Sequence, residues 1–386
     1  MVSIAYPFLI SLAAALVVRD QAPKPLSFTL NKKTHPKPLK PAPLGNPSPK
    51  NSKVNDENVK LFANGPSYLI NLGLIDENQQ LQLVLDTGSA DLWVDASKLK
   101  DTAGFTKNGE PFRIGYGDHS TVQGDFGTSS VWLDNGVEVK DLQWALGTDV
   151  ELTDGIQNGI LGVGKVQNEA PYRQRGQSYA NFPQKLKDEG YTNSNGYSYY
   201  LNQPDKPTGT ITFGGRDLAK VKGPVATITP STTDENAPYD GIVVSKLSAS
   251  NGDSFGSFGG ILDTGTTLTY LPYDAINALN IPGLTYDADA QWYYITPNQP
   301  SDQYVSYWFD DAEIKVPLAD LVFKEYDDND QPTGKYWFGI QGTPDENSAT
   351  LGDTFLRSAY VTVNHDTNQV LISAVNYTDK ENIVGL

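Results

Sequence analysis

From residue 61 onward, apolar residues gather in short runs separated by turns rich in Gly, Asn and Asp. Representative runs are YLINLGLI (68–75), QWALG (143–147), YSYYLN (197–202), GTITFGG (209–215), YVTVNH (360–365) and QVLISA (369–374). Runs this short, bounded by turn residues, are typical of strands. Helical spacing is scarce, and the short helix candidates are NFPQKLKDEG (181–190) and YDAINALN (273–280). The pattern therefore predicts a mostly β protein.

The N-terminal segment follows a different pattern. Residues 8–18, FLISLAAALVV, form an apolar run that is too short to span a bilayer but matches the hydrophobic region of a signal peptide. The next residues are rich in Pro and Lys and cannot form a core by themselves, although LSFTL (26–30) is able to add a strand to a sheet. We therefore predict a signal peptide over 1–18 and a basic propeptide over 19–53, with a flexible linker as the alternative for the second segment.

Charge divides the chain in the same place. Residues 1–60 hold nine Lys and Arg against three Asp and Glu, whereas the rest holds 20 against 43, so a net charge of +6 precedes one of -23. An acidic body argues against a nucleic-acid partner. It also suggests that the basic propeptide lies against the body through charge attraction. The 386 residues are enough for two lobes with separate cores.

Composition also narrows the chemistry. The chain has no cysteine, which excludes disulfides, thiol nucleophiles and Cys-ligated zinc. Its three histidines, His35, His119 and His365, show no metal-binding spacing, so an all-carboxylate site is the one kind of metal site left open. We predict no metal and no cofactor. Beyond residue 18 there is no long apolar run and no hydrophobic C-terminal tail, so we also predict no membrane partner.

An internal repeat carries the main signal for function. LVLDTGSADLWV at 83–94 is echoed by GILDTGTTLTYL at 260–271, which places Asp86 and Asp263 177 residues apart. A second pair of segments follows downstream, GILGVG (159–164) and TLGDTFL (350–356). A repeat of this kind predicts two similar lobes related by a pseudo-twofold axis. We place the lobes at residues 54–225 and 226–386.

Each residue type in the repeat has a physical role. A single Asp-Thr-Gly is an ordinary turn, but two copies at the ends of apolar strands are much more specific. Two facing carboxylates on one water cannot both ionise, so the pair holds one proton over an acid range. The ionised member can then accept a proton from water while the protonated member donates to a carbonyl oxygen. The supporting residues are Thr87 and Thr264, which can cross-link the loops, Ser89 and Thr266, which can donate to the carboxylates, and Gly88 and Gly265, which allow close backbone approach.

These motifs resemble those of the pepsin-like aspartic proteases, and among them the candidapepsin-type secreted enzymes of yeasts. The resemblance covers nearly all of residues 55–380. It runs through DTGSADLWV (86–94), FRIGYGDHSTVQG (112–124), NGILGVGK (158–165), YSYYLNQPDKPTGTITFGGRDLAK (197–220), ILDTGTTLTYL (261–271) and LGDTFLRSAYVTVN (351–364). It implies a bilobal pepsin-like fold, two β lobes with a cleft between them.

The resemblance also implies roles for individual residues. Asp86 and Asp263 would be the catalytic pair. Tyr116 matches the tyrosine of a flap that closes over the substrate, and Trp93 matches the tryptophan that supports it. The implied substrate-binding residues beside Tyr116 are Gly117, Asp118, Val84, Ile160 and Thr267. Independently, RIGYGDHSTVQG has the pattern of a Gly-rich hairpin with an aromatic residue near its tip, which suits a mobile lid.

Two departures from the family pattern stand out. His119 occupies a flap position where relatives usually carry Gly, and His tolerates a positive φ less well. We expect it to alter the flap turn or its response to pH. The cysteines that staple each lobe in close relatives are missing here, so stability must come from the two lobe cores.

Two further motifs carry less weight. GILGVGKV (159–166) fits the pattern of a phosphate-binding loop, but Val166 stands where Ser or Thr should hold magnesium, and the βαβ context is missing. Asn376 begins the one N-glycosylation sequon, Asn-Tyr-Thr, and is a candidate site only, because a sequon permits but does not require a glycan.

The sequence thus predicts a secreted acid endopeptidase made as a zymogen, extracellular or, as the alternative, in the vacuolar lumen. Expected partners are polypeptide substrates, its own propeptide as an intramolecular inhibitor, and statine-type inhibitors; we expect a monomer. The rival hypothesis is a non-catalytic binding protein on the same scaffold. Such proteins usually lose an aspartate or the flap tyrosine, and Asp86, Asp263 and Tyr116 are all present.

Overall fold

One sheet runs through most of the molecule in the computed structural model, which describes residues 23–33, 67–117, 120–152, 158–231, 238–327, 329, 331–344 and 349–386. The predicted signal peptide and most of the predicted propeptide lie outside these residues. The sheet has the strand order β12-β27-β26-β9-β10-β1-β2-β3-β8-β4-β7-β6-β5. The mostly β prediction is confirmed, since strands dominate the described chain.

The first part of this sheet joins the two ends of the chain. Its strands are β1 (Leu26–Lys33), β9 (Gly196–Tyr200), β10 (Thr208–Phe213), β12 (Val221–Ile228), β26 (Ala359–Asn364) and β27 (Gln369–Val375). The strand β1 lies between β10 and β2, and pairs antiparallel with both. The predicted boundary between lobes, at 225/226, falls within β12. The lobes therefore share a sheet at the place where the sequence suggested a division.

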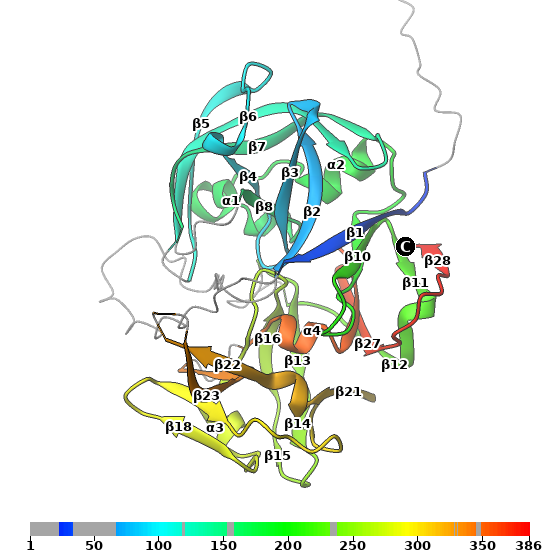
Figure 1. Ribbon diagram of the computed structural model, residues 1–386. Coiled ribbons are helices and arrows are strands. Elements are labelled where there is room, and N and C mark those ends of the chain that lie inside the picture. Colours follow the sequence, from blue (N-terminus) through cyan, green and yellow to red (C-terminus); the bar gives the residue numbers. More distant parts are fainter. Residues whose placement is uncertain are drawn as a thin grey trace, which may run out of the picture.

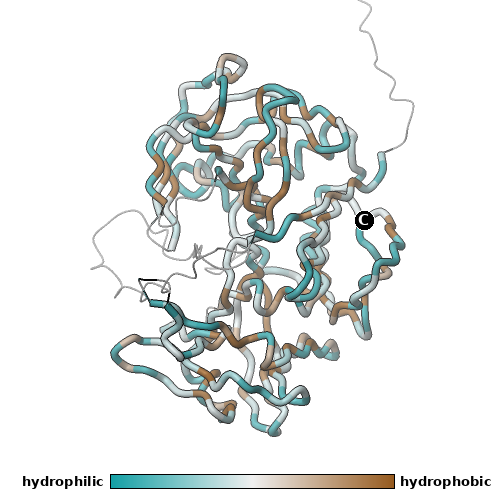
Figure 2. The backbone as a smooth tube through the Cα atoms, in the orientation of Figure 1, coloured by the Kyte–Doolittle hydropathy of each residue, from teal (hydrophilic) through white to brown (hydrophobic). Residues whose placement is uncertain are grey.

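The second part of the sheet forms the N-terminal half, shown in blue and cyan in Figure 1. Its strands are β2 (Ser67–Leu74), β3 (Asp76–Asp86), β4 (Leu92–Asp95), β5 (Thr106–Gly115), β6 (Thr121–Leu133), β7 (Glu138–Glu151) and β8 (Gly159–Gly162). Hydrophobic and hydrophilic residues alternate along many of these strands (Figure 2), which matches a sheet with one face on a core.

The C-terminal half, in yellow and orange in Figure 1, is built from three smaller sheets. One contains β13 (Gly241–Val244), β16 (Phe258–Leu262), β17 (Thr269–Pro272), β24 (Ile340–Thr343) and β25 (Ala349–Leu351). The others contain β14 (Lys246–Ala249), β15 (Ser254–Phe255), β20 (Tyr304–Phe309) and β21 (Ala312–Pro317), and β18 (Leu284–Asp287), β19 (Trp292–Ile295), β22 (Val322–Tyr326) and β23 (Pro332–Phe338). Two short strands, β11 (Gly215–Asp217) and β28 (Ile383–Gly385), pair with each other in a separate sheet beside the large one (Figure 1).

The helices of the described residues are short. They are α1 (Ala170–Arg175), α2 (Phe182–Asp188), α3 (Tyr273–Asn277) and α4 (Asp353–Leu356), with 3-10 turns η1 (Ala96–Lys98), η2 (Val166–Asn168), η3 (Leu218–Lys220) and η4 (Leu318–Leu321). Both predicted helices are present, as α2 and α3. The start of α2 is set by Asn181, whose side chain accepts from the backbone N–H of Gln184, and by a proline in the first turn.

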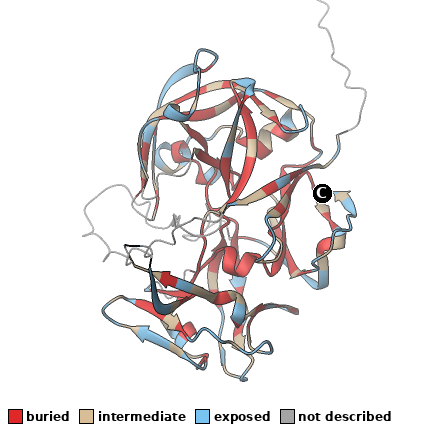
Figure 3. Ribbon diagram, viewed as in Figure 1, coloured by how far each residue is buried: buried red, intermediate tan, exposed pale blue. Residues whose placement is uncertain are grey.

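Among the described residues, buried apolar side chains form one large core and three smaller clusters, one of which includes residues of β4 and β5. The large core includes Trp144, Tyr197, Tyr307 and Phe355 and extends through both halves. Figure 3 shows buried residues on the inner strands and exposed ones at the outer turns. Burial of apolar side chains, aliphatic and aromatic, is the main favourable term in folding, and this chain has no disulfides to add to it.

The pseudo-twofold relation is visible in strand pairing. In the N-terminal half, β3 pairs parallel with β8, β8 pairs antiparallel with β4, and β4 pairs parallel with β7. In the C-terminal half, β16 pairs parallel with β25, β25 pairs antiparallel with β17, and β17 pairs parallel with β24. The two repeats therefore place Asp86 and Asp263 at equivalent ends of equivalent strands.

Candidate active site

The two aspartates stand at the ends of β3 and β16. Each lies beside a strand from the second pair of repeated segments, β8 in the N-terminal half and β25 in the C-terminal half. Both β8 and β25 pass so close to the aspartate loops that a side chain would not fit. A Cβ on Gly162 would lie 2.6 Å from the backbone nitrogen of Asp91, and one on Gly352 would lie 2.3 Å from the carbonyl oxygen of Leu268. Glycine is thus required in both downstream segments for the loops to pack against them.

Four hydrogen bonds tie the two aspartate loops together. The backbone N–H of Thr87 donates to Oγ1 of Thr264, and the backbone N–H of Thr264 donates to Oγ1 of Thr87, each over 3.1 Å. Each hydroxyl then donates to a carbonyl of the other loop, Thr87 to Leu262 at 2.9 Å and Thr264 to Leu85 at 2.7 Å. This reciprocal set holds residues from opposite halves in one fixed arrangement.

The carboxyl groups are held in matching ways. Asp86 accepts from the backbone N–H of Gly88 at 2.8 Å and from the hydroxyl of Ser89 at 2.5 Å. Asp263 accepts from the N–H of Gly265 at 2.8 Å and from the hydroxyl of Thr266 at 2.5 Å. All the predicted supports of the pair are therefore in contact with it or with its loop.

The two carboxyl groups also lie against each other. A Cβ on Gly88 would fall 2.6 Å from Oδ1 of Asp263, so the loop of one aspartate touches the carboxyl group of the other. Both side chains are buried. Burial raises the pKa of Asp86, and hydrogen bonds from Ser89, Asp263 and Gly88 oppose that rise. Burial raises the pKa of Asp263 well above its ordinary value, and the negative charge of Asp86 adds to the rise.

The comparisons with known proteins agree with this geometry. The family model for eukaryotic aspartyl proteases matches residues 67–375. This chain belongs to the eukaryotic aspartyl proteases. It is accordingly an aspartic endopeptidase, a hydrolase.

Among curated aspartyl proteases, secreted aspartic protease 1 of Candida albicans is 35% identical over 347 residues, which cover 83% of this chain and 84% of that protein. Candidapepsin-2 of Candida parapsilosis is 34% identical over 80% of this chain and 76% of its own length. A solved structure, the aspartic proteinase from Irpex lacteus, aligns with a TM-score of 0.66 at 20% identity, covering 81% of this chain and 95% of that one. That structure supports the bilobal pepsin-like fold.

A hairpin of this aspartyl protease carries the predicted flap. Gly115 pairs with Thr121 where β5 meets β6, and Tyr116 follows the end of β5. The indole N–H of Trp93 donates to the hydroxyl oxygen of Tyr116 at 2.5 Å, and both side chains are buried. Gly117 is half-buried beside them. Asp118 and His119 lie outside the described residues, so their predicted roles stay predictions.

Behind the hairpin lie the residues predicted to line the substrate pocket. Val84 and Ile160 pair across β3 and β8 and belong to the same apolar cluster as Tyr116. The equivalent pair in the other half, Ile261 and Thr350, was missed from the sequence. The repeat contained the signal, because Val84 and Ile261 both stand two residues before an aspartate. Thr267 is buried, and its carbonyl accepts from the backbone N–H of Thr354 at 3.1 Å.

A second set of residues could not be found from local pattern. Asn168 donates from its side chain to the carbonyl of Gly88 at 2.8 Å, and Tyr179 donates from its hydroxyl to Asp91 at 2.8 Å. Between them lies Glu169, which is fully buried and whose pKa burial raises to about 9. These residues lie about 80 positions beyond the loop that they contact, and no motif announces them.

The other two motifs of the sequence analysis make contacts within the fold, and glycosylation of Asn376 stays a prediction. The lysine of the phosphate-loop pattern, Lys165, is buried 3.8 Å from Asp240, which also contacts His365 at 2.9 Å. The side chain of Asn376 donates to the carbonyl of Ala219 at 2.8 Å. Within the described part of the chain, no cluster of acidic, His or Cys side chains is suited to hold a metal ion, and no helix is long and apolar enough to cross a membrane.

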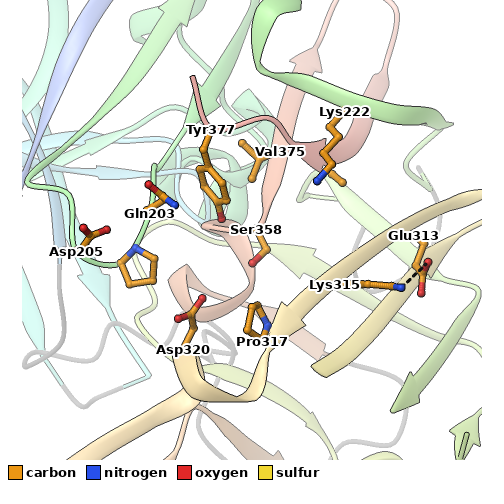
Figure 4. A pocket seen from close by; sticks show the side chains of 12 residues that line it. Gln203, Asp205, Lys222, Glu313, Lys315, Pro317, Asp320, Ser358, Val375 and Tyr377 are labelled. Atoms are coloured by element: carbon orange, nitrogen blue, oxygen red, sulfur yellow. Dashed lines mark ion pairs between the residues drawn. The ribbon is translucent and has the colours of Figure 1, made fainter. Parts of the chain in front are cut away.

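Figure 4 shows the residues that line a pocket of about 570 Å³. Its lining includes Lys222, Lys315, Asp320 and Tyr377 and carries charges of both signs. None of the predicted site residues lines it. The active-site candidate is therefore defined by the two aspartate loops and the hairpin.

Proposed function

We propose that this aspartyl protease is a secreted acid endopeptidase in which Asp86 and Asp263 activate one water molecule. The observation that carries the proposal is the reciprocal bonding of Thr87 and Thr264, which brings the two loops into register so that both carboxyl groups face the same point. Two buried carboxyl groups in contact share one proton, since ionising both would place two negative charges together.

The asymmetry of the pair assigns the roles. Burial raises the pKa of both carboxyl groups, and the charge of Asp86 raises that of Asp263 further, so the pair keeps one proton; in the proposed mechanism Asp263 carries it and Asp86 is ionised. Asp86 accepts a proton from water as the water oxygen attacks the peptide carbonyl carbon, while Asp263 donates its proton to the carbonyl oxygen. The tetrahedral intermediate then collapses: one of its hydroxyl groups returns a proton to Asp263, the carbon–nitrogen bond breaks, and the leaving nitrogen takes the proton from Asp86.

The surrounding residues suit a polypeptide substrate. Tyr116 on its hairpin closes the site from one side, with Val84 and Ile160 beneath it, so that an apolar side chain is favoured on the acyl side of the scissile bond. Ile261 and Thr350 occupy the equivalent place for the opposite side. Statine-type compounds, which imitate the tetrahedral intermediate, are the expected inhibitors.

The protein is further proposed to be made as a zymogen and exported as a monomer. The strand β1 lies within the predicted propeptide and is bound between β10 and β2, with Phe28 and Leu30 buried. This supports a propeptide held by the sheet as well as by charge. At low pH the body carboxylates take up protons and the attraction weakens. Several relatives are named as secreted proteases, which supports an extracellular location over a vacuolar one.

The deciding experiment is hydrolysis of a denatured protein substrate at pH 3–5 by the processed chain, with and without a statine-type inhibitor. Asp86→Asn and Asp263→Asn should each lower kcat by about 10⁴-fold or more, because either change removes the shared-proton pair. Asp302→Asn, at an exposed aspartate, is the matched control and should leave the rate unchanged. Absence of inhibitor-sensitive hydrolysis would favour the non-catalytic binding protein instead, whereas activity that survives Asp86→Asn would overturn the proposed role of the aspartate pair.

A further inference from the structure

The turn η2 and the residues around it pack against the loop that carries Asp86. The hydrogen bonds that join them include three near η2: Gly164 N–H donates to the carbonyl of Ser89 at 2.8 Å, Ala170 N–H donates to Oδ2 of Asp91 at 2.7 Å, and the side-chain amide of Asn168 donates to the carbonyl of Gly88 at 2.8 Å. The third is the one side-chain donor among them, and it acts on the glycine next to the catalytic machinery.

Both backbone polar groups of Gly88, its N–H and its carbonyl, are therefore hydrogen-bonded. Its N–H donates to Oδ1 of Asp86, and its carbonyl accepts from Asn168. Its Cα faces the carboxyl group of Asp263 so closely that a Cβ would be 2.6 Å from Oδ1. A rotation of this residue would lengthen the bond to Asp86 and move the backbone relative to Asp263 at the same time.

The donor itself is firmly placed. Asn168 is nearly buried, and its backbone N–H donates to the carbonyl of Lys165 at 2.8 Å. The next residue, Glu169, is fully buried and accepts at Oε2 from the backbone N–H of Tyr179 at 2.9 Å. Tyr179 closes the set by donating to Asp91 on the catalytic loop. A donor with so little freedom costs little entropy when it orients another group.

The C-terminal half is built differently at the equivalent place. There the chain after β25 enters α4, and the contacts to the aspartate loop come from the backbone: Asp353 N–H donates to the carbonyl of Thr266 at 2.9 Å, and Thr354 N–H to that of Thr267 at 3.1 Å. Gly265 is half-buried where Gly88 is buried. Among the described residues, the side-chain clamp from Asn168 acts on the glycine of the Asp86 loop.

We propose that Asn168 is a positioning residue, which holds the Gly88 carbonyl and thereby fixes the carboxyl group of Asp86 relative to that of Asp263. The inference rests on the proposed function, in which these two carboxyl groups act on one water. It adds a residue that does not touch the reacting atoms and whose effect passes through one peptide unit.

The test compares wild type with Asn168→Ala in the same hydrolysis assay, over pH 2.5–6. Without the clamp the N–H of Gly88 holds the Asp86 carboxylate less well, so that carboxylate takes up a proton more readily. We expect kcat to fall about tenfold with KM nearly unchanged, and the acid limb of kcat/KM to move to higher pH by about half a unit. Both values equal to wild type would overturn the proposal, whereas an inactive wild type would overturn the proposed function instead.

A matched control is available in Asn181, which is also buried and also donates to a glycine carbonyl, that of Gly164, over 2.8 Å. Asn181→Ala should lower thermal stability much as Asn168→Ala does but leave the acid limb in place. An equal shift of the limb in both variants would show general loosening and overturn the specific role of Asn168.

A second variant keeps the test decisive if Asn168→Ala does not fold. In Asn168→Asp the new carboxyl group has an O–H donor only while it is protonated. Its activity relative to wild type should therefore be near one at pH 3 and fall several-fold by pH 6. A ratio that does not change with pH would count against the proposal.

Discussion

The two halves of the molecule share a strand scheme but surround their aspartates with different chemistry. In the N-terminal half the aspartate loop is covered by a hairpin with Tyr116 on Trp93, and by the buried Glu169 with its neighbours. In the C-terminal half the covering element is α4, where Asp353 is fully buried and burial raises its pKa well above the ordinary value, with the positive charge of Arg357 opposing. Symmetry sets where the carboxyl groups lie, and the asymmetric surroundings make them unequal.

The largest expected effect concerns stability against pH. The folded state keeps a proton on Glu169 up to about pH 9, whereas the unfolded chain releases it near pH 4.5. The contribution of Glu169 to the unfolding free energy is therefore fully present below pH 4.5 and is lost as the pH rises toward 9. Between pH 4.5 and 7 the loss from this one group is about 3 kcal/mol. In Glu169→Gln that loss should disappear, which denaturant unfolding at both pH values would measure.

Both proteins for this measurement should carry Asp86→Asn, so that autolysis does not interfere. Asp353→Asn tests the other half, since Asp353 has a pKa shift of the same sign. An unfolding free energy that falls as steeply with pH in Glu169→Gln as in its parent would show that the buried carboxyl group of the N-terminal half does not determine the pH response.

The next effect tests the symmetry itself. Thr87→Ala and Thr264→Ala each remove one hydroxyl that accepts one bond and donates another between the loops. Each should lower the unfolding free energy by about 2 kcal/mol, and the two values should agree because the bonds are reciprocal. The corresponding Thr→Ser variants keep the hydroxyl and should lose much less. A large difference in unfolding free energy between the two alanine variants would show that the two loops are not equivalent.

A smaller effect is expected from the hairpin, which only one half possesses. Tyr116→Phe leaves the buried indole N–H of Trp93 without its acceptor. We expect kcat/KM to fall about tenfold, since the ring can then leave the position over the substrate. Trp93→Phe should give a similar loss by removing the donor. Unchanged kinetics in Tyr116→Phe would mean that packing alone positions the hairpin.

The smallest effect concerns Thr350, the polar residue among the four positions of the two equivalent strand pairs, Val84 with Ile160 and Ile261 with Thr350. Thr350→Ile makes the Ile261 pair resemble Val84 with Ile160. Preference for a branched apolar residue on the leaving side of the scissile bond should rise a few-fold, which peptide-library profiling would detect. The reverse change, Ile160→Thr, should lower apolar preference on the acyl side. A cleavage profile that does not respond to Thr350→Ile would remove this position from the set that contacts substrate.

Much of this arrangement could be predicted from a short motif that occurs twice in the sequence. Asp-Thr-Gly at the end of an apolar run fixed the place of both aspartates, because a strand end and a glycine turn are local properties. The same logic would have given Ile261, had the repeat been compared position by position. The two short helix candidates, at 181–190 and 273–280, correspond to α2 and α3.

The residues that escaped prediction are those whose role depends on distant packing. Asn168 and Glu169 have no periodic or motif signal, and their partners are far away in the sequence. The strand β1 was recognisable as extended, but its neighbours β10 and β2 were not, since strand order depends on the whole sheet. The sheet also continues through β12, so the amino-acid composition contains no sharp signal for a lobe boundary there.

The bonds between Thr87 and Thr264 join positions that are 177 residues apart, and this separation has a consequence in time. At a synthesis rate of roughly 5–20 residues per second, about 10 to 35 seconds pass between the emergence of the first loop and that of the second. During that interval the growing chain carries Asp86 without Asp263, so the proposed water-activating pair is absent. Under the proposed mechanism, chain order thus delays assembly of the aspartate pair until the second loop has been made.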